Sequence, residues 1–367
     1  MRLSFPHMGN LYIPIKTFFE SLGIEVVVPP LSNKETLELG VKHSPEFACL
    51  PLKVNIGNMI QALEKGANTI VMAGGVGPCR FGYYSEVQRE ILSDLGYDFE
   101  MIVLDPPKGN LLKLVKNIKR LIGDNSFKKI WFSARLAWKK AVLLEELDYA
   151  DGMARVSKKL NKKKANNLFN YFEKEIDLTV SFDKLQCIEN QMKECYHDLT
   201  PSFEPIKIGL VGEIYTVLDN FVNMDIKKKL EDWGVYVDKS ISLTEWANTN
   251  LLLRLLNIHG EKNTEIAARP YLNHFVGGHG LQSVGNTVLY ANKKFDGVLH
   301  VLPFTCMPEI IAKSILPAVS KKYNIPVLSL VMDEHAADTG LNTRLEAFVD
   351  LLCKRKEGMK DEILFRS

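Results

Sequence analysis

Short apolar runs alternate with helix-like patterns over the first part of the chain. In the helix-like segments, apolar residues recur every three or four positions. Because the short runs are continuously apolar and are bounded by Gly and Pro, they predict parallel strands that are buried on both faces of a sheet. The expected strands cover residues 1–8, 24–28, 69–73 and 99–104, and the expected helices cover residues 11–22, 52–65 and 84–95.

The middle of the chain has a different pattern. Strand-like runs largely disappear after residue 110, and charged helical patterns such as residues 136–147 and 169–176 predict a helical insert or bridge. From residue 206 the alternation of strands and helices returns. We therefore predict an α/β protein of two similar Rossmann- or flavodoxin-like parallel-sheet lobes. Its expected domains are a first lobe over residues 1–125, a mainly helical bridge over 126–204 and a second lobe over 205–367.

The two lobes share a sequence pattern that indicates an internal duplication. A Gly-Asn pair precedes a buried strand in each half, ending at Asn58 in the first and at Asn286 in the second. A cysteine then follows the end of that strand in both halves. Asn58 lies 21 positions before Cys79, and Asn286 lies 20 positions before Cys306.

Composition and charge exclude several classes of protein. Hydrophobic residues make up 46% and charged residues 25% of the chain, with a formal net charge of +2, so no basic surface for nucleic acid is expected. The first residues lack the apolar stretch and cleavage site of a signal peptide, and no apolar run is long enough to cross a bilayer. We expect a cytoplasmic protein without membrane segments. In that compartment the six cysteines favour thiols, metal ligation or redox chemistry over structural disulfides.

Three of the cysteines stand where parallel α/β sheets bind ligands. Cys79 and Cys306 each follow a strand, at the carboxyl edge where ligands collect. Cys49 lies between Pro45 and Pro51, which frame the entry to a helix. Helix N-termini favour thiolate, the form of cysteine that ligates metals. We therefore predict that Cys49, Cys79 and Cys306 are ligands of a metal or cluster held between the lobes.

The duplicated pattern leaves one ligand position without a thiol. Cys49 lies nine positions before Asn58, and the residue nine positions before Asn286 is Gly277. Three thiolates would leave one iron of a four-iron cluster open or bound by another group, whereas structural clusters are usually closed by four cysteines. An open position would leave room for substrate, as in catalytic metal sites.

Other interpretations of these residues stay open. Free cysteines are often buried as small hydrophobic side chains, which suits Cys353, and Cys187 and Cys195 lie in the charged helical region without a site pattern. Zinc accepts thiolates too, but the chain has no close Cys-x-x-Cys pair. Glu213 follows a strand and could act on substrate or cap a helix, and His335 could be a base or a polar loop residue.

Several stretches resemble the 2-hydroxyacyl-CoA dehydratase family, specifically its activase-related dehydratase-like group. The likeness extends over nearly the whole chain. The matching stretches are Glu46-Phe47-Ala48-Cys49-Leu50-Pro51-Leu52-Lys53, Gly77-Pro78-Cys79-Arg80-Phe81-Gly82-Tyr83-Tyr84, Gly209-Leu210-Val211-Gly212-Glu213-Ile214-Tyr215, Pro303-Phe304-Thr305-Cys306-Met307-Pro308-Glu309 and Asn342-Thr343-Arg344-Leu345-Glu346-Ala347-Phe348.

The resemblance implies a 4Fe-4S cluster on Cys49, Cys79 and Cys306, with a double-cubane cluster as a variant among related members. It also implies three partners: an ATP-hydrolysing iron–sulfur activase that donates one low-potential electron, a related larger dehydratase-like subunit, and an acyl-CoA or other small-molecule substrate. The chemistry would be dehydration of a 2-hydroxyacyl-CoA through a ketyl radical, or a related reduction. Because the chain has no Gly-Lys-Ser or Gly-Lys-Thr phosphate loop, ATP hydrolysis is expected of the partner.

Two other classes of function compete with this enzyme component. The chain could be a non-catalytic, cluster-bearing partner or electron-transfer subunit, with the active site on another chain. It could also be a cluster-free binding protein with ligand between its lobes. Iron and sulfide analysis separates the second of these alternatives from the cluster hypotheses.

Overall fold

The computed structural model describes residues 1–75, 77–105, 111–242, 244 and 263–364. They divide into two compact units. The first contains Met1–Asp148 and Phe169–Glu194, together with Ser242 and Thr244, and the second contains Tyr149–Leu168, Cys195–Ile241 and residues 263–364. Each unit contains one parallel sheet, and we call these units the first and second lobe.

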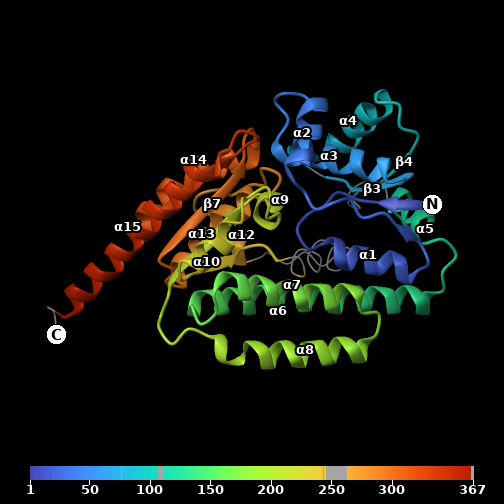
Figure 1. Ribbon diagram of the computed structural model, residues 1–367. Coiled ribbons are helices and arrows are strands. Elements are labelled where there is room, and N and C mark those ends of the chain that lie inside the picture. Colours follow the sequence, from blue (N-terminus) through green and yellow to red (C-terminus); the bar gives the residue numbers. More distant parts are fainter. Residues whose placement is uncertain (76, 106–110, 243, 245–262, 365–367) are drawn as a thin grey trace. The chain divides into compact units, whose positions relative to one another are not determined.

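The sheet of the first lobe has the strand order β2-β1-β3-β4, and all its strands are parallel (Figure 1). Leu3 of β1 pairs with Thr69 of β3, and Ala73 at the end of β3 pairs with Leu104 of β4. The strands are β1 (Arg2–Ser4), β2 (Glu25–Val26), β3 (Thr69–Ala73) and β4 (Glu100–Leu104), and the helices are α1 (Tyr12–Ser21), α2 (Lys34–His43), α3 (Leu50–Glu64), α4 (Phe81–Asp94) and α5 (Leu111–Ile122).

The sheet of the second lobe repeats this topology with the order β6-β5-β7-β8, again all parallel. The two sheets confirm the prediction of two similar α/β lobes. The strands are β5 (Ile206–Gly212), β6 (Val235–Lys239), β7 (Gly297–Pro303) and β8 (Val327–Met332), and the helices are α9 (Ile214–Leu218), α10 (Ile226–Asp232), α12 (Asn263–Ala268), α13 (Gly280–Asn292), α14 (Met307–Tyr323) and α15 (Asp338–Leu364).

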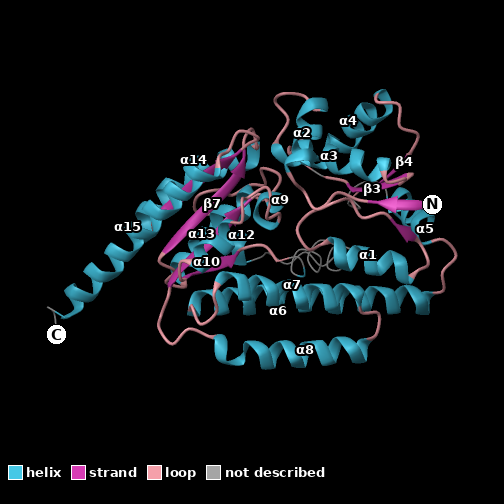
Figure 2. Cartoon of the chain, viewed as in Figure 1, coloured by secondary structure: helices cyan, strands magenta, loops and turns pink. Residues whose placement is uncertain are grey.

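Three long helices, α6 (Phe127–Ser157), α7 (Lys162–Leu178) and α8 (Phe182–Tyr196), make up the predicted helical insert (Figure 2). Within the first lobe α8 packs along the first half of α6: the rings of Phe132 and Phe182 meet edge to face at 5.4 Å, and Lys139 pairs with Glu189. The chain passes between the compact units once inside each of these three helices. The three-domain division at residues 125 and 204 stays a prediction.

The duplication extends to a tight contact between two helices in each lobe. In the first lobe α3 crosses α2 at Gly57, where an added Cβ would lie 1.9 Å from the carbonyl oxygen of Thr36. In the second lobe α13 crosses α12 at Gly285, where an added Cβ would lie 1.9 Å from the carbonyl oxygen of Thr264. Each glycine stands 21 positions after its threonine. Equivalent pairs of helices therefore pack at an equivalent glycine in the two lobes.

The largest differences from the sequence prediction in the first lobe concern β1 and α2. Strand β1 ends at Ser4 rather than at residue 8, because Pro6 has no N–H for a ladder and the His7 amide donates to Asn58 Oδ1 at 3.1 Å. Helix α2 was not predicted. Its start is marked by a capping box in which Asn33 accepts from the Thr36 amide and Thr36 accepts from the Asn33 amide.

The buried His7 should make the first lobe sensitive to acid. His7 is 2% exposed, and burial lowers its pKa from 6.5 to about 4. Between pH 6.5 and pH 4, His7 is therefore protonated in the unfolded chain but neutral in the folded chain. Stability falls as the pH falls through this window. From pH 7 to pH 5 we expect a loss of about 2 kcal/mol in unfolding free energy that His7→Phe abolishes. Urea unfolding at both pH values measures it, and His197→Phe, at a side chain that is 81% exposed, should keep the wild-type loss.

Candidate functional site

Cys49 occupies the N-cap of α3. Its backbone is extended, with φ −70° and ψ 154°, and Pro51 stands in the first turn of the helix. This position suits proline, because the first amides of a helix have no intrahelical acceptor. Among the described residues the Cys49 side chain makes no capping hydrogen bond to α3, so it is available to another partner. Cys49 is 8% exposed, and its thiol is enclosed by the first-lobe core.

That partner is the phenol of Tyr84. The Cys49 sulfur and the Tyr84 hydroxyl are in hydrogen-bond contact, and Tyr84 is 8% exposed in the same core cluster. Burial raises the pKa of Tyr84, and negative charge on Cys49 raises it further. The hydroxyl therefore stays protonated and can donate its hydrogen to a thiolate.

Cys79 lies near the same phenol. It is half-buried in the turn before α4, where its carbonyl accepts from the Gly82 amide at 3.3 Å. Negative charge on Cys79 also raises the pKa of Tyr84. Two of the predicted ligands, which are 30 positions apart in the sequence, thus lie within electrostatic reach of one hydroxyl group.

One turn beyond Tyr84, the same helix carries an unexplained buried amide. Gln88 is 0% exposed, and neither its side-chain oxygen nor its nitrogen has a hydrogen-bond partner among the described residues. Residues four apart on a helix share a face, so Gln88 follows Tyr84 along α4. Burying an amide without partners costs about 1–3 kcal/mol, and such groups call for an explanation such as water or a ligand.

Cys306 belongs to the second lobe and occupies the N-cap of α14, with Pro308 in the first turn. It is 9% exposed, and the preceding Thr305 has a left-handed backbone with φ 64°. Within the described residues its side chain makes no capping hydrogen bond to α14. Cys49 and Cys306 therefore have the same local setting, a cysteine before a proline-containing first helical turn.

The second lobe also contains a buried, hydrogen-bonded His–Glu pair that the sequence analysis did not single out. His300 Nε2 and Glu309 Oε2 are 2.9 Å apart, both side chains are fully buried, and the Nδ1 atom of His300 lies 3.1 Å from Ser329 Oγ. Glu309 stands one turn after Cys306 in α14. In the sequence, His300 looked like one position in an apolar strand. The only available signal was a charged residue in the first turn after a cysteine.

Glu213 caps a helix. Its carboxylate accepts from the amides of Tyr215 and Thr216 at 3.0 and 2.9 Å, at the start of α9. Burial raises the pKa of Glu213, the hydrogen bonds from these residues oppose the increase, and the charge of Glu309 adds to it. The capping alternative therefore accounts for this residue, and the capped helix begins at Ile214.

The position without a thiol in the second lobe is a turn. Gly277 and Gly278 have φ values of 87° and 47°, in the left-handed region that favours glycine, directly before α13. The other three cysteines lie on the helices α8 and α15. Cys187 and Cys195 are exposed, and Cys353 is partly exposed because Leu352, at 1% exposure, takes the buried position on α15.

The predicted ligands are thus distributed as a pair in the first lobe, Cys49 and Cys79, and a single thiol in the second, Cys306. In the part of the chain that the structure describes, no group of three or more His, Cys, Asp or Glu side chains is arranged to hold a metal ion. The donor chemistry of the first-lobe pair nevertheless suits iron: the Cys49 thiol contacts a protonated phenol, the charge of Cys79 acts on the same phenol, and a buried amide without partners among the described residues stands one helical turn further along α4.

These features define a two-lobed α/β protein with cysteines at the carboxyl ends of its sheets. Residues 7–73 match a family model described as a CoA enzyme activase uncharacterised domain (DUF2229). The match lies within the first lobe and covers the Cys49 junction and β3. A search of curated proteins found no match. None of the described helices is both long and apolar enough to cross a membrane.

Proposed function

We propose that this chain holds a 4Fe-4S cluster, or its double-cubane variant, through Cys49, Cys79 and Cys306. The observation that supports the proposal is the contact of the Cys49 sulfur with the buried Tyr84 hydroxyl, on whose pKa the charge of Cys79 also acts. Cys306, at the corresponding strand–helix junction of the duplicated lobe, supports it as the third ligand. When bound, the cluster would supply low-potential one-electron reduction.

We further propose that the chain is the iron–sulfur component of an ATP-dependent, activase-reduced dehydratase-like system. The family match at residues 7–73 and the cysteine motifs support this assignment. The partners would be an ATP-hydrolysing iron–sulfur activase and a related larger subunit, and the substrate would be a 2-hydroxyacyl-CoA or another reducible small molecule. The chain's own residues would hold the cluster with three thiolates, donate a hydrogen bond from Tyr84 and exclude water around Cys49.

Iron and sulfide analysis after purification without oxygen tests the proposal. We expect about four iron and four sulfide per chain, as for a single cubane, or about twice that for the double-cubane variant. Iron near zero after anaerobic reconstitution would overturn it. With iron present, the cognate activase and ATP should reduce the cluster. Reduction without turnover of any 2-hydroxyacyl-CoA would identify an electron-transfer subunit rather than the enzyme component.

Tyr84→Phe should lower the reduction potential of the bound cluster without releasing it. Hydrogen bonds to a ligand sulfur stabilise the more negative, reduced state, so removal of the hydroxyl disfavours reduction. A tenfold change in the equilibrium of a one-electron couple corresponds to about 60 mV, and we expect a shift of that order to lower potential. Redox titration followed by electron paramagnetic resonance measures it.

The neighbouring Tyr83 supplies a matched control. Its side chain is 63% exposed, so Tyr83→Phe removes a hydroxyl group that faces solvent instead of the hydroxyl group that contacts the Cys49 thiol. The potential should stay at the wild-type value in this variant. Equal potentials in Tyr84→Phe and wild type, at equal iron content, would contradict the assigned hydrogen bond.

A further inference from the structure

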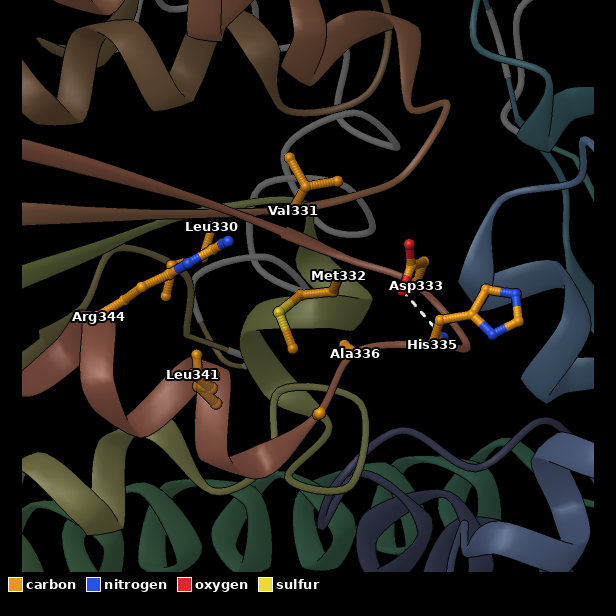
Figure 3. Close-up of a pocket in the computed structure, with 10 residues that line it drawn as sticks. Leu330, Val331, Met332, Asp333, His335, Ala336, Leu341 and Arg344 are labelled. Carbon is orange, nitrogen blue, oxygen red and sulfur yellow. Dashed lines mark hydrogen bonds between the residues drawn. The ribbon is translucent and has the colours of Figure 1, made fainter.

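The second lobe contains a cavity that the cysteine chemistry does not use. It has a volume of about 270 Å³ and lies between the carboxyl end of β8 and the first two turns of α15 (Figure 3). Met332 and Leu341 supply apolar walls, and Asp333, His335 and Arg344 supply polar ones. The volume approaches that of a small-metabolite site.

The position of the cavity is one where parallel α/β sheets bind ligands. β8 is an edge strand of its described sheet, hydrogen-bonded to β7 on one side. Ligands of such sheets collect beyond the carboxyl ends of the strands, where loops and helix starts present polar groups. Here the loop after β8 is shaped by Asp333, whose Oδ1 accepts from the His335 amide at 2.9 Å.

The charged groups lie at opposite ends of the cavity. Figure 3 shows the Arg344 side chain rising from α15 toward Leu330, while Asp333 and His335 lie beyond Met332 on the other side. Within the described residues Arg344 makes no ion pair. A guanidinium group binds carboxylates through two parallel hydrogen bonds, and the far carboxylate of Asp333 accepts hydrogen bonds from hydroxyl or ammonium groups.

The duplicated lobe provides an internal comparison. A hollow of about 210 Å³ lies along β4, where it is lined by Met101–Val103 of the strand, by Asp105 directly after it, and by residues of α4 and α5. Its two arginines already have partners: Arg89 pairs with Glu86, and Arg120 pairs with Glu100 at 2.6 Å. In the described structure, the arginines of this first-lobe hollow pair with carboxylates, whereas Arg344 of the second-lobe cavity makes no ion pair.

We propose that the second-lobe cavity binds a small carboxylate that carries a hydrogen-bond donor at its other end. The carboxylate pairs with Arg344, and a hydroxyl or ammonium group faces Asp333. This site goes beyond the proposed function, because it involves none of the three cysteines and requires no cluster.

Binding to the full chain, measured by isothermal titration calorimetry, tests the site with 4-aminobutyrate, 4-hydroxybutyrate and butyrate. We expect saturable binding of at least one of the substituted acids at millimolar concentration, and butyrate should bind about tenfold more weakly because it offers no donor to Asp333. A preference for the amino or the hydroxy acid tells which donor the site takes. Arg344→Gln should weaken binding by about tenfold or more.

Arg89→Gln in the first-lobe hollow is the control and should leave the affinity unchanged. Absence of saturable binding of all three acids at about 10 mM, or equal affinity in wild type and Arg344→Gln, would overturn the proposal. The titration does not depend on iron content. A chain without iron that still binds the acids would contradict the proposed function and support this site. A chain that holds iron but binds none of the acids would support the proposed function and contradict this site.

Discussion

Replacing Cys79 by alanine should remove essentially all bound iron from the chain. Cys79 is half-buried in a turn, so its loss should leave the first-lobe core intact while one of three thiolates disappears. A cubane cluster with two remaining protein ligands is not retained through purification, because each thiolate supplies both a bond and negative charge. Iron per chain, measured after anaerobic reconstitution, should fall from about four to near zero. Cys49→Ala and Cys306→Ala should have the same effect.

The remaining cysteines provide matched controls for this series. Cys187 and Cys195 are exposed on α8, and their alanine variants should keep the wild-type iron content. Because Cys49 and Cys306 are buried, circular dichroism of each variant must first show the native helix content. Retention of iron in folded Cys79→Ala, or equal loss in Cys187→Ala, would contradict the assigned ligands.

The strands of the fold could be predicted because their buried, continuously apolar runs are local features. Residues 69–73 and β3 agree at both ends, and the expected strand at 99–104 differs from β4 by one residue at its start. Helix α2 escaped prediction because its first turn depends on a capping box at Asn33 and Thr36 rather than on apolar periodicity. Only a search for capping residues finds such a helix.

The candidate site could be predicted in part, for a similar reason. Prolines at 51 and 308 mark helix starts in the sequence, so the N-cap positions of Cys49 and Cys306 were accessible to a local argument. The contact between Cys49 and Tyr84 could not be predicted locally, because it joins two helices whose packing depends on the whole first-lobe core. The pairing of His300 with Glu309 was hidden likewise, since it joins a strand to the following helix.

The Gly-Asn pairs that revealed the duplication have a structural reason. Gly57 and Gly285 mark the points where α3 and α13 touch the backbone of a neighbouring helix. A side chain at either point would have to displace a main-chain carbonyl, which cannot rotate away as the end of a flexible side chain can. The repeated glycine is therefore a packing requirement of both lobes, independent of any ligand.

Gly57→Ala should accordingly destabilise the first lobe, and Gly285→Ala the second, each by about 3 kcal/mol or more. Alanine favours a helix over glycine by about 1 kcal/mol, but a methyl group 1.9 Å from a backbone oxygen forces the helices apart. Hydrogen exchange resolved along the chain should show faster opening of α2 and α3 in Gly57→Ala and of α12 and α13 in Gly285→Ala. Gly358→Ala on α15 is the control, because nothing lies within 4 Å of its added Cβ and only the gain in helix propensity remains. If Gly57→Ala opens no faster than Gly358→Ala, the close crossing of α2 and α3 is not a feature of the folded protein.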